Sequence, residues 1–338
     1  MFAAKKYRQT MVLRSSIFAS SGNSSKARIL VAAVFLAVLG LLSPTLKTAG
    51  LLSYQDTRYI QIITAPLICL FLIYSDRKRV FATARYSPRP GLPLFFLSVL
   101  FCLICIRLGG TATIESLIAP MLSLFLLCQS VFVLYYGLTS WRAALYPLGC
   151  LLLVIPIPEA AMNWASTAYQ QGSALASYAI FNMVGISALR NGNTFSIPGL
   201  DFNIAPECSG IRSGVAFLLV ALVAGHMYLH SGWNRLFLTL ATLPIAMVKN
   251  AIRIVVTTSL GAYVDRSYID GPFHHQYGGI IFSPLDFLFF VPLVLWLQRI
   301  ERRAANLKAS SGQAFPLAVE THAERDSPTE FDSRLGFS

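Results

Sequence analysis

Three kinds of reactive side chain occur in the second half of the sequence. Cys208 carries a thiol, Arg253 carries a permanent cation, and the adjacent His274 and His275 carry imidazoles. A thiolate is a nucleophile, and a guanidinium stabilises negative charge but cannot serve as a base. Histidine exchanges protons near neutral pH. Together these groups predict acyl transfer by a thiol, with the cation stabilising the thiolate or the oxyanion that forms.

Cys208 stands in a sequence context that favours its ionised form. An apolar run of helix length begins at this residue, so we expect Cys208 at a helix N-terminus, where unpaired N–H groups and the helix dipole stabilise a thiolate. Arg212 follows four positions later and is expected on the same helical face, where its charge adds to this effect. Small residues in this run permit another helix to approach closely: Ser209, Gly210, Ser213 and Gly214.

Other ionisable and thiol side chains also fall within apolar segments. Ionisable groups inside a membrane span are functional candidates, although they also pair with one another to hold a bundle together. Besides Arg253, they are Glu115, Arg212, Lys249 and Asp286. The five remaining cysteines are expected to behave as small buried hydrophobic residues: Cys69, Cys102, Cys105, Cys128 and Cys150. Because Cys102-x-x-Cys105 has no second pair to complete a metal site, we expect no metal here.

The composition places these groups in an integral membrane protein. Of the 338 residues, 55% are hydrophobic and 12% are charged, whereas soluble domains carry about 25% charged residues. A membrane-spanning helix needs roughly 20 apolar residues. Eight stretches meet or approach that length: 29–46, 59–75, 91–108, 117–138, 143–157, 208–230, 236–262 and 279–298. We therefore predict an all-α membrane protein with about eight transmembrane helices.

The positive charges follow the pattern of a membrane topology and do not indicate a nucleic-acid partner. Cytoplasmic segments beside spans are rich in Lys and Arg. The net charge of +12 comes largely from such residues before the first span, between spans two and three, and after the last span. Both termini are therefore predicted to be cytoplasmic, with anionic lipid headgroups as partners. We divide the chain into a basic N-terminal segment (1–28), a membrane domain (29–298) and a cytoplasmic tail (299–338) that is expected to be disordered.

One long loop is predicted on the outer face of the membrane, over residues 158–207. Residues 159–187 have the pattern of an amphipathic helix or helix pair, with Trp164, Tyr169 and Tyr178 suited to a membrane interface. Asn191-Gly192-Asn193 is a tight-turn signal, and two short strand-like runs flank Pro198-Gly199. The simplest interpretation is a small outer-face helix followed by a β-hairpin that leads directly into Cys208.

With these residues in view, the chain resembles the exosortase/archaeosortase family over about residues 151–282. The likeness is carried by Ile155-Pro156-Ile157-Pro158, Asn191-Gly192-Asn193, Glu207-Cys208-Ser209-Gly210-Ile211-Arg212-Ser213, Asn250-Ala251-Ile252-Arg253-Ile254, and His274 with Gly278 and Phe282. The block around Cys208 is highly specific, and the Asn250-x-x-Arg253 and His274-x-x-x-Gly278 elements follow it in the order that the family shows. The first 140 residues match the family only as a set of hydrophobic spans.

The resemblance implies a polytopic cysteine transpeptidase or protease with a catalytic core at about 151–282, in a bacterial cytoplasmic (inner) membrane. Its implied substrates are exported proteins whose C-terminal sorting signal has a short motif (PEP-type in bacteria), a transmembrane helix and a basic cluster. The family accompanies exopolysaccharide production, which suits transfer of the cut protein to a surface acceptor of unknown identity.

The resemblance also assigns roles to residues of this sequence. Cys208 would be the nucleophile and Arg253 the stabiliser of the thiolate and oxyanion. His274 would carry the proton, because its spacing to Gly278 fits better than that of His275. The active site would lie on the outer (periplasmic) face. Glu207, Arg212 and Asn250 are candidate substrate-binding residues. No organic cofactor or metal is implied, since the thiol, guanidinium and imidazole suffice for the chemistry.

Two other functions stay open on the sequence alone. The charges within spans suit a transporter or flippase, which predicts that Glu115, Lys249, Arg253 and Asp286 line a continuous path. A non-catalytic assembly factor for surface polysaccharide would use the outer loop to bind a partner, and it would work without Cys208 or Arg253. A transporter has no need for a thiol beside an outer histidine, so the sequence favours the enzyme.

Overall fold

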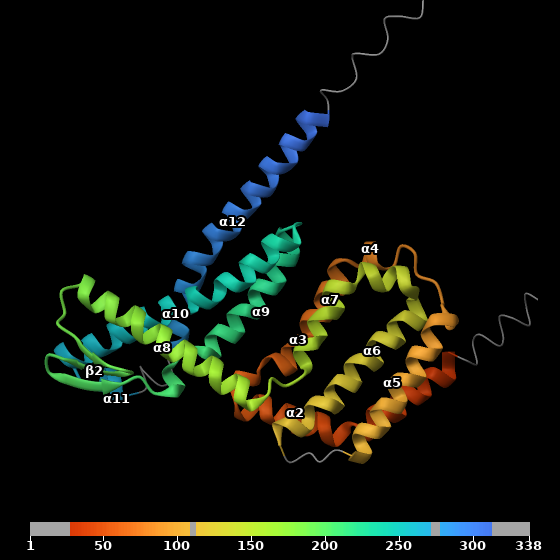
Figure 1. Cartoon of the computed structure of the whole chain (residues 1–338), viewed down its shortest axis with the longest axis horizontal. Coiled ribbons are helices and arrows are strands. Elements are labelled where there is room, and N and C mark those ends of the chain that lie inside the picture. The colour runs from red at the N-terminus through yellow and green to blue at the C-terminus, as the bar shows by residue number, and fades with distance from the viewer. Residues whose placement is uncertain (1–27, 109–112, 272–277, 313–338) are drawn as a thin grey trace, which may run out of the picture.

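A computed structural model describes residues 28–108, 113–271 and 278–312, and these are almost entirely helical (Figure 1). The first helix covers Arg28–Leu41. The other helices follow in chain order: α2 (Ser43–Gln55), η1 (Thr57–Tyr59), α3 (Gln61–Ser75), α4 (Arg77–Val80), α5 (Pro88–Leu108), α6 (Ile114–Ala143), α7 (Leu145–Gly149), η2 (Cys150–Val154), α8 (Glu159–Met183), η3 (Pro206–Cys208), α9 (Ile211–Tyr228), α10 (Gly232–Tyr263), α11 (Ser267–Asp270) and α12 (Gly278–Gly312).

The number of long apolar helices agrees with the sequence. Among the described residues, six helices are long and apolar enough to cross a membrane, and two bent pairs of helices pass the same test together. The first pair joins Arg28–Leu41 to α2 at 55°, and the second joins Leu145–Val154 to α8 at 97°. The predicted all-α fold with about eight spans is therefore confirmed, and the chain is a multi-pass membrane protein.

The predicted fifth span, 143–157, is not one straight helix. α6 takes the first residue of this range, and the next helical stretch covers only Leu145–Val154 before the bend. Pro156 and Pro158 lie at the bend, where they interrupt helical hydrogen bonding because proline has no N–H. The chain then enters α8, which is a single helix and runs across the direction of α12 in Figure 1.

A kink in α6 also went unpredicted. Gly137 has a φ of 84°, a conformation that glycine adopts without steric cost. The segment before α5 hydrogen-bonds to the backbone here, with Arg85 N donating to Tyr136 O at 3.1 Å and Ser87 N donating to Leu134 O at 3.0 Å. Carbonyl groups that would otherwise lack a partner at the kink are thus satisfied by another part of the chain.

A small antiparallel sheet follows α8, with strands β1 (Leu189–Asn191), β2 (Thr194–Ile197) and β3 (Leu200–Asn203) in that order. The predicted hairpin around Pro198-Gly199 is confirmed as β2 and β3, and β1 adds a strand that was not predicted. Phe195 is fully buried and stacks on Phe202 with ring centroids 5.3 Å apart. The sheet packs against α8 and α10 through a core that includes Phe181 and Ile254. This packing fixes the end of β3, from which the chain continues to Cys208.

α10 is the central helix of the C-terminal half, in contact with α8, α9, α11 and α12. α8 lies close to α9, since a Cβ atom on Gly214 would be 2.6 Å from the Tyr169 hydroxyl oxygen. Tyr169 is therefore part of the core, at 5% exposed, and not the interfacial side chain that was predicted. Trp164 on the same helix is 76% exposed, as an interfacial residue would be.

Candidate active site

Cys208 lies in a short turn between the sheet and α9, which we call the Cys208 turn (residues 205–210). Cys208 N donates to Ala205 O at 2.9 Å, and Ser209 N donates to Pro206 O at 3.1 Å. Gly210 then adopts a φ of 89°, and α9 begins only at Ile211. The prediction that Cys208 opens this helix is therefore wrong, because the left-handed glycine separates the thiol-bearing turn from the helix.

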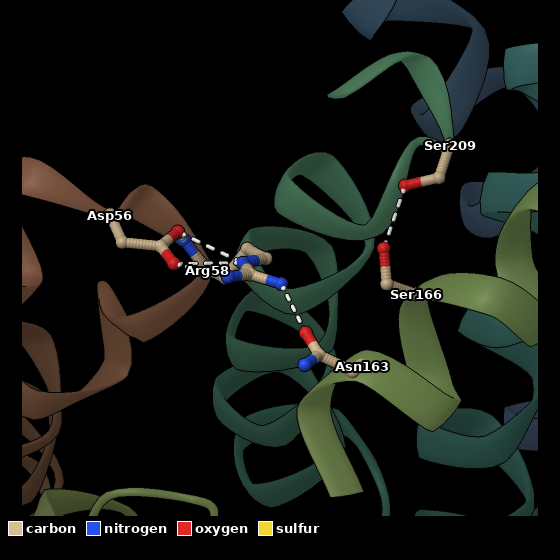
Figure 2. Close-up of polar contacts among 5 residues, drawn as sticks. All are labelled: Asp56, Arg58, Asn163, Ser166 and Ser209. Carbon is tan, nitrogen blue, oxygen red and sulfur yellow. Dashed lines mark hydrogen bonds and ion pairs between the residues drawn. The ribbon is translucent and has the colours of Figure 1, made fainter. Parts of the chain in front are cut away.

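The Cys208 turn rests against polar side chains on one face of α8. Ser173 Oγ donates to Ser209 O at 3.1 Å, and Gln170 Nε2 donates to Ile204 O. The hydroxyl oxygens of Ser166 and Ser209 lie 3.5 Å apart (Figure 2). The α8 residues follow one another at intervals of four and three, which places them on a single helical face. This spacing is visible in the sequence, but the sequence does not show which part of the chain these side chains bind.

Asn250 on α10 supports the Cys208 turn from the other side. Its Nδ2 donates to Cys208 O at 2.8 Å and to Ser173 Oγ at 3.1 Å. The residue is only 2% exposed. The structure thus places the amide of Asn250, a candidate substrate-binding group, on the backbone of the nucleophile candidate.

Arg253 lies one helical turn after Asn250 on α10 and interacts electrostatically with the Cys208 thiol. Its side chain is partly buried, and its carbonyl oxygen accepts a hydrogen bond from Thr257 Oγ1 at 2.6 Å. The structure therefore places Arg253 on the helix that holds the Cys208 turn, three positions after Asn250, which binds the Cys208 carbonyl group. A cation close to a thiol favours the thiolate, which is the reactive form.

The remaining catalytic candidates, His274 and His275, lie outside the described residues, between α11 and α12. α11 packs on the end of α10, where the Ile269 side chain contacts the position of Gly261. Gly261 lies eight residues beyond Arg253, or about 12 Å along the helix axis. The side chain of Glu207, another candidate, is also outside the described part of the structure.

Arg212 is exposed in the first turn of α9 and interacts electrostatically with Asp56. It does not share a helical face with Cys208, because Cys208 precedes the helix. Asp56 forms an ion pair with Arg58 at 2.7 Å, and Arg58 Nη1 donates to Asn163 Oδ1 at 3.1 Å (Figure 2). Burial raises the pKa of Asp56, but the hydrogen bonds and charge of Arg58, with the charge of Arg212, hold it below its ordinary value of 3.8.

The other charges within helices do not form an open path. Lys249 Nζ and Asp286 Oδ2 are 3.2 Å apart, and both side chains are buried between α10 and α12. Glu115 instead lies exposed in the first turn of α6, where its Oε1 accepts a hydrogen bond from Glu159 N at 3.4 Å. A water-filled path would expose the charges that line it, so this arrangement does not support a transporter.

The cysteines outside the Cys208 turn follow the expectation for small hydrophobic residues. Cys69, Cys102, Cys105 and Cys150 are buried, and Cys128 is partly buried. Cys208 is also partly buried, and it interacts electrostatically with the Arg253 guanidinium.

Comparison with known families finds that residues 53–297, most of the chain, match the sequence model of a family described as transmembrane exosortase. Comparison with curated proteins and with solved structures finds no match. The matched range begins in α2 and ends in α12, so it includes Cys208, Asn250 and Arg253.

Proposed function

The chain belongs to the transmembrane exosortase family, and on this premise we propose that it cleaves C-terminal sorting signals of exported proteins through a thioester on Cys208. The family is one of membrane transpeptidases or proteases that act on exported proteins. The observation that carries the proposal is that α10 holds the Cys208 turn through Asn250 and carries Arg253, which interacts electrostatically with Cys208, three positions later. The expected signal is a short motif of the PEP type, a transmembrane helix and a basic cluster.

The proposed reaction begins with the Cys208 thiolate, stabilised by Arg253. Its sulfur attacks the carbonyl carbon that follows the recognition motif and forms a C–S bond, which places a negative charge on the carbonyl oxygen. The Arg253 guanidinium stabilises this oxyanion. When the intermediate collapses, the C–N bond breaks and the leaving amine takes a proton from His274. An acceptor amine or water then attacks the thioester carbonyl carbon and gives a proton to His274, and the C–S bond breaks to release the Cys208 thiolate.

We place the site on the periplasmic face of a bacterial inner membrane, with both termini in the cytoplasm. This orientation is supported by the excess of Lys and Arg in the segments on the predicted cytoplasmic side. The same orientation puts the Cys208 turn where an exported substrate arrives, with its transmembrane helix still in the bilayer.

A processing assay tests the proposal. The protein is co-expressed with a tagged substrate that ends in the motif, an apolar helix and a basic cluster, and the mass of the new C-terminus is measured. We expect processing by the wild type and none by Cys208→Ala. The matched control is Cys128→Ala, because Cys128 is also partly buried but lies in α6.

Equal processing by the wild type and Cys208→Ala would refute the proposed nucleophile. Loss of processing in His274→Ala but not in His275→Ala would support the assignment of the proton carrier. The mass of the new end distinguishes hydrolysis from transfer to an acceptor.

A further inference from the structure

We infer that Asn250 is a positioning residue for the proposed reaction, holding the Cys208 thiol at Arg253 by binding the carbonyl group of Cys208 itself. The inference rests on the proposed function, since it concerns the same thiol. It differs from the sequence-based expectation that Asn250 contacts substrate.

The hydrogen bonds of Asn250 leave its amide nitrogen no capacity for a substrate. The NH₂ group has two hydrogens, and it donates to Cys208 O at 2.8 Å and to Ser173 Oγ at 3.1 Å. The amide orientation follows from this chemistry, because an amide oxygen cannot donate to the Cys208 carbonyl. The residue is 2% exposed, so substrate does not reach it.

The same contacts hold two successive peptide groups. Asn250 binds the carbonyl oxygen of Cys208, while Ser173, which accepts from Asn250, donates to the carbonyl oxygen of Ser209 at 3.1 Å. The turn is therefore held from α10 and from α8 at once. The peptide group before Cys208 is held as well, because Cys208 N donates to Ala205 O at 2.9 Å. With the peptide groups on both sides of Cα held, the direction of the Cα–Cβ bond is fixed and one side-chain torsion stays free for the thiol.

Gly210 shows how closely Asn250 fits the turn. A Cβ atom at position 210 would lie 2.9 Å from Cγ and 3.0 Å from Cβ of Asn250, and the φ of 89° also favours glycine. Asn250 thus occupies the space beside the turn and binds its backbone.

The position of Asn250 on α10 links the turn to Arg253. The two residues are three positions apart on one helix, about 4.5 Å along its axis. One rigid helix therefore carries both the group that holds Cys208 and the cation that interacts with its thiol. A displacement of about 1 Å in a catalytic group lowers a rate by roughly 100-fold.

The test compares Asn250→Leu, which keeps the side-chain size but removes both donors, with the wild type. The full chain is purified in lipid nanodiscs, and alkylation of Cys208 by iodoacetamide is followed by peptide mass spectrometry from pH 5 to pH 10, a range chosen to span thiol ionisation. We expect about 10-fold slower alkylation at pH 7 and a half-maximal rate at higher pH. In the processing assay we expect kcat to fall about 100-fold with KM changed less than about twofold.

Asn234→Leu is the matched control. Asn234 is also on α10, and its Nδ2 also donates at 2.8 Å, but its partner is Glu301 on α12. Asn234 lies sixteen positions before Asn250, so we expect the loss of its hydrogen bond to change the melting temperature but not the pH dependence of Cys208 alkylation. Asn250→Ala, which removes both donors and adds no bulk beside the turn, is the second variant if Asn250→Leu does not fold, and we expect it to move the profile in the same direction.

An unchanged alkylation profile and kcat in folded Asn250→Leu would overturn the positioning role. A lower melting temperature with an unchanged profile would do the same, since it would show a structural role only. If Asn250→Leu does not fold, an unchanged profile in Asn250→Ala overturns the inference. Retained processing by Cys208→Ala would instead overturn the proposed function, and it is measured separately from alkylation.

Discussion

Removing one member of the buried Lys249–Asp286 pair should destabilise the protein more than removing both. The two side chains are 4% and 7% exposed, and the ion-pair distance is 3.2 Å. Asp286 Oδ1 makes no hydrogen bond within the described structure, so Lys249 is the partner that compensates the buried carboxylate. Breaking a buried pair costs about 3–5 kcal/mol, whereas replacing both members by apolar residues of similar volume is close to neutral.

The two single variants should also differ from each other. Lys249 and Arg253 are four positions apart on α10 and interact electrostatically. In Asp286→Leu the Lys249 ammonium stays buried near a second cation, whereas in Lys249→Met one carboxylate is left. We therefore expect the loss in free energy of unfolding to lie at the upper end of about 3–5 kcal/mol for Asp286→Leu and at the lower end for Lys249→Met. The double variant should have a free energy of unfolding within about 1 kcal/mol of the wild type.

The assay is equilibrium unfolding of the purified protein in mixed micelles with increasing denaturing detergent. A double-mutant cycle over the four proteins gives the coupling energy of the pair. Arg79→Gln is the control, because Arg79 is 65% exposed and 3.8 Å from Asp76, and such pairs contribute about 0–1 kcal/mol. If the double variant lost as much stability as the sum of the single variants, the argument from a buried ion pair would be refuted.

Three further predictions concern the packing of the helices and one surface ion pair. Gly214→Ala should lower the free energy of unfolding by about 1–3 kcal/mol, because the new Cβ would lie 2.6 Å from the Tyr169 hydroxyl oxygen. Gly225→Ala on the same helix is the control, and it should leave the free energy of unfolding unchanged because the nearest atoms are 3.7 Å away. Gly137→Ala should lower the free energy of unfolding by about 1–3 kcal/mol, because position 137 has a positive φ and the new Cβ would lie 2.9 Å from the Arg85 carbonyl oxygen. Gly149→Ala is the control in thermal unfolding, because a Cβ at position 149 meets nothing within 4 Å. The pKa of Asp56 is below its ordinary value of 3.8, so its ion pair stabilises the folded state above that pH and the contribution is lost as the pH falls through the lowered pKa. Melting temperatures of wild type and Asp56→Asn should therefore differ at pH 6 and converge as the pH falls below the ordinary value of 3.8, and a constant difference would contradict this assignment.

The long helices were predictable because hydropathy and length alone select them. The predicted span 91–108 ends where α5 ends, and the tight-turn signal at residues 191–193 falls between β1 and β2. The predicted span over 143–157 failed because an apolar run does not show where the backbone turns. There the local sequence is as apolar as a span, but Pro156 and Pro158 mark the bend into α8.

The candidate site was predictable only in part. The order of reactive groups along alternating spans predicted that Cys208 and Arg253 face the same side of the membrane, and the structure brings them together. The position of Cys208 relative to α9 was missed, since the sequence does not show that Gly210 adopts a φ of 89° and that α9 begins only after it. The supporting role of Ser173 was also missed, because its partners are distant in the sequence and become neighbours only in the folded protein.

Because the Cys208 turn is supported from both α8 and α10, it is completed in stages while the chain is being synthesised. The α8 residues that hold the turn are made before it, but Asn250 follows Cys208 by 42 positions. At a synthesis rate of about 5–20 residues per second, this interval lasts roughly 2–8 seconds. Each newly made molecule therefore carries its thiol for some seconds before Asn250 is made, and the completion of α10 supplies both the support from Asn250 and the guanidinium of Arg253.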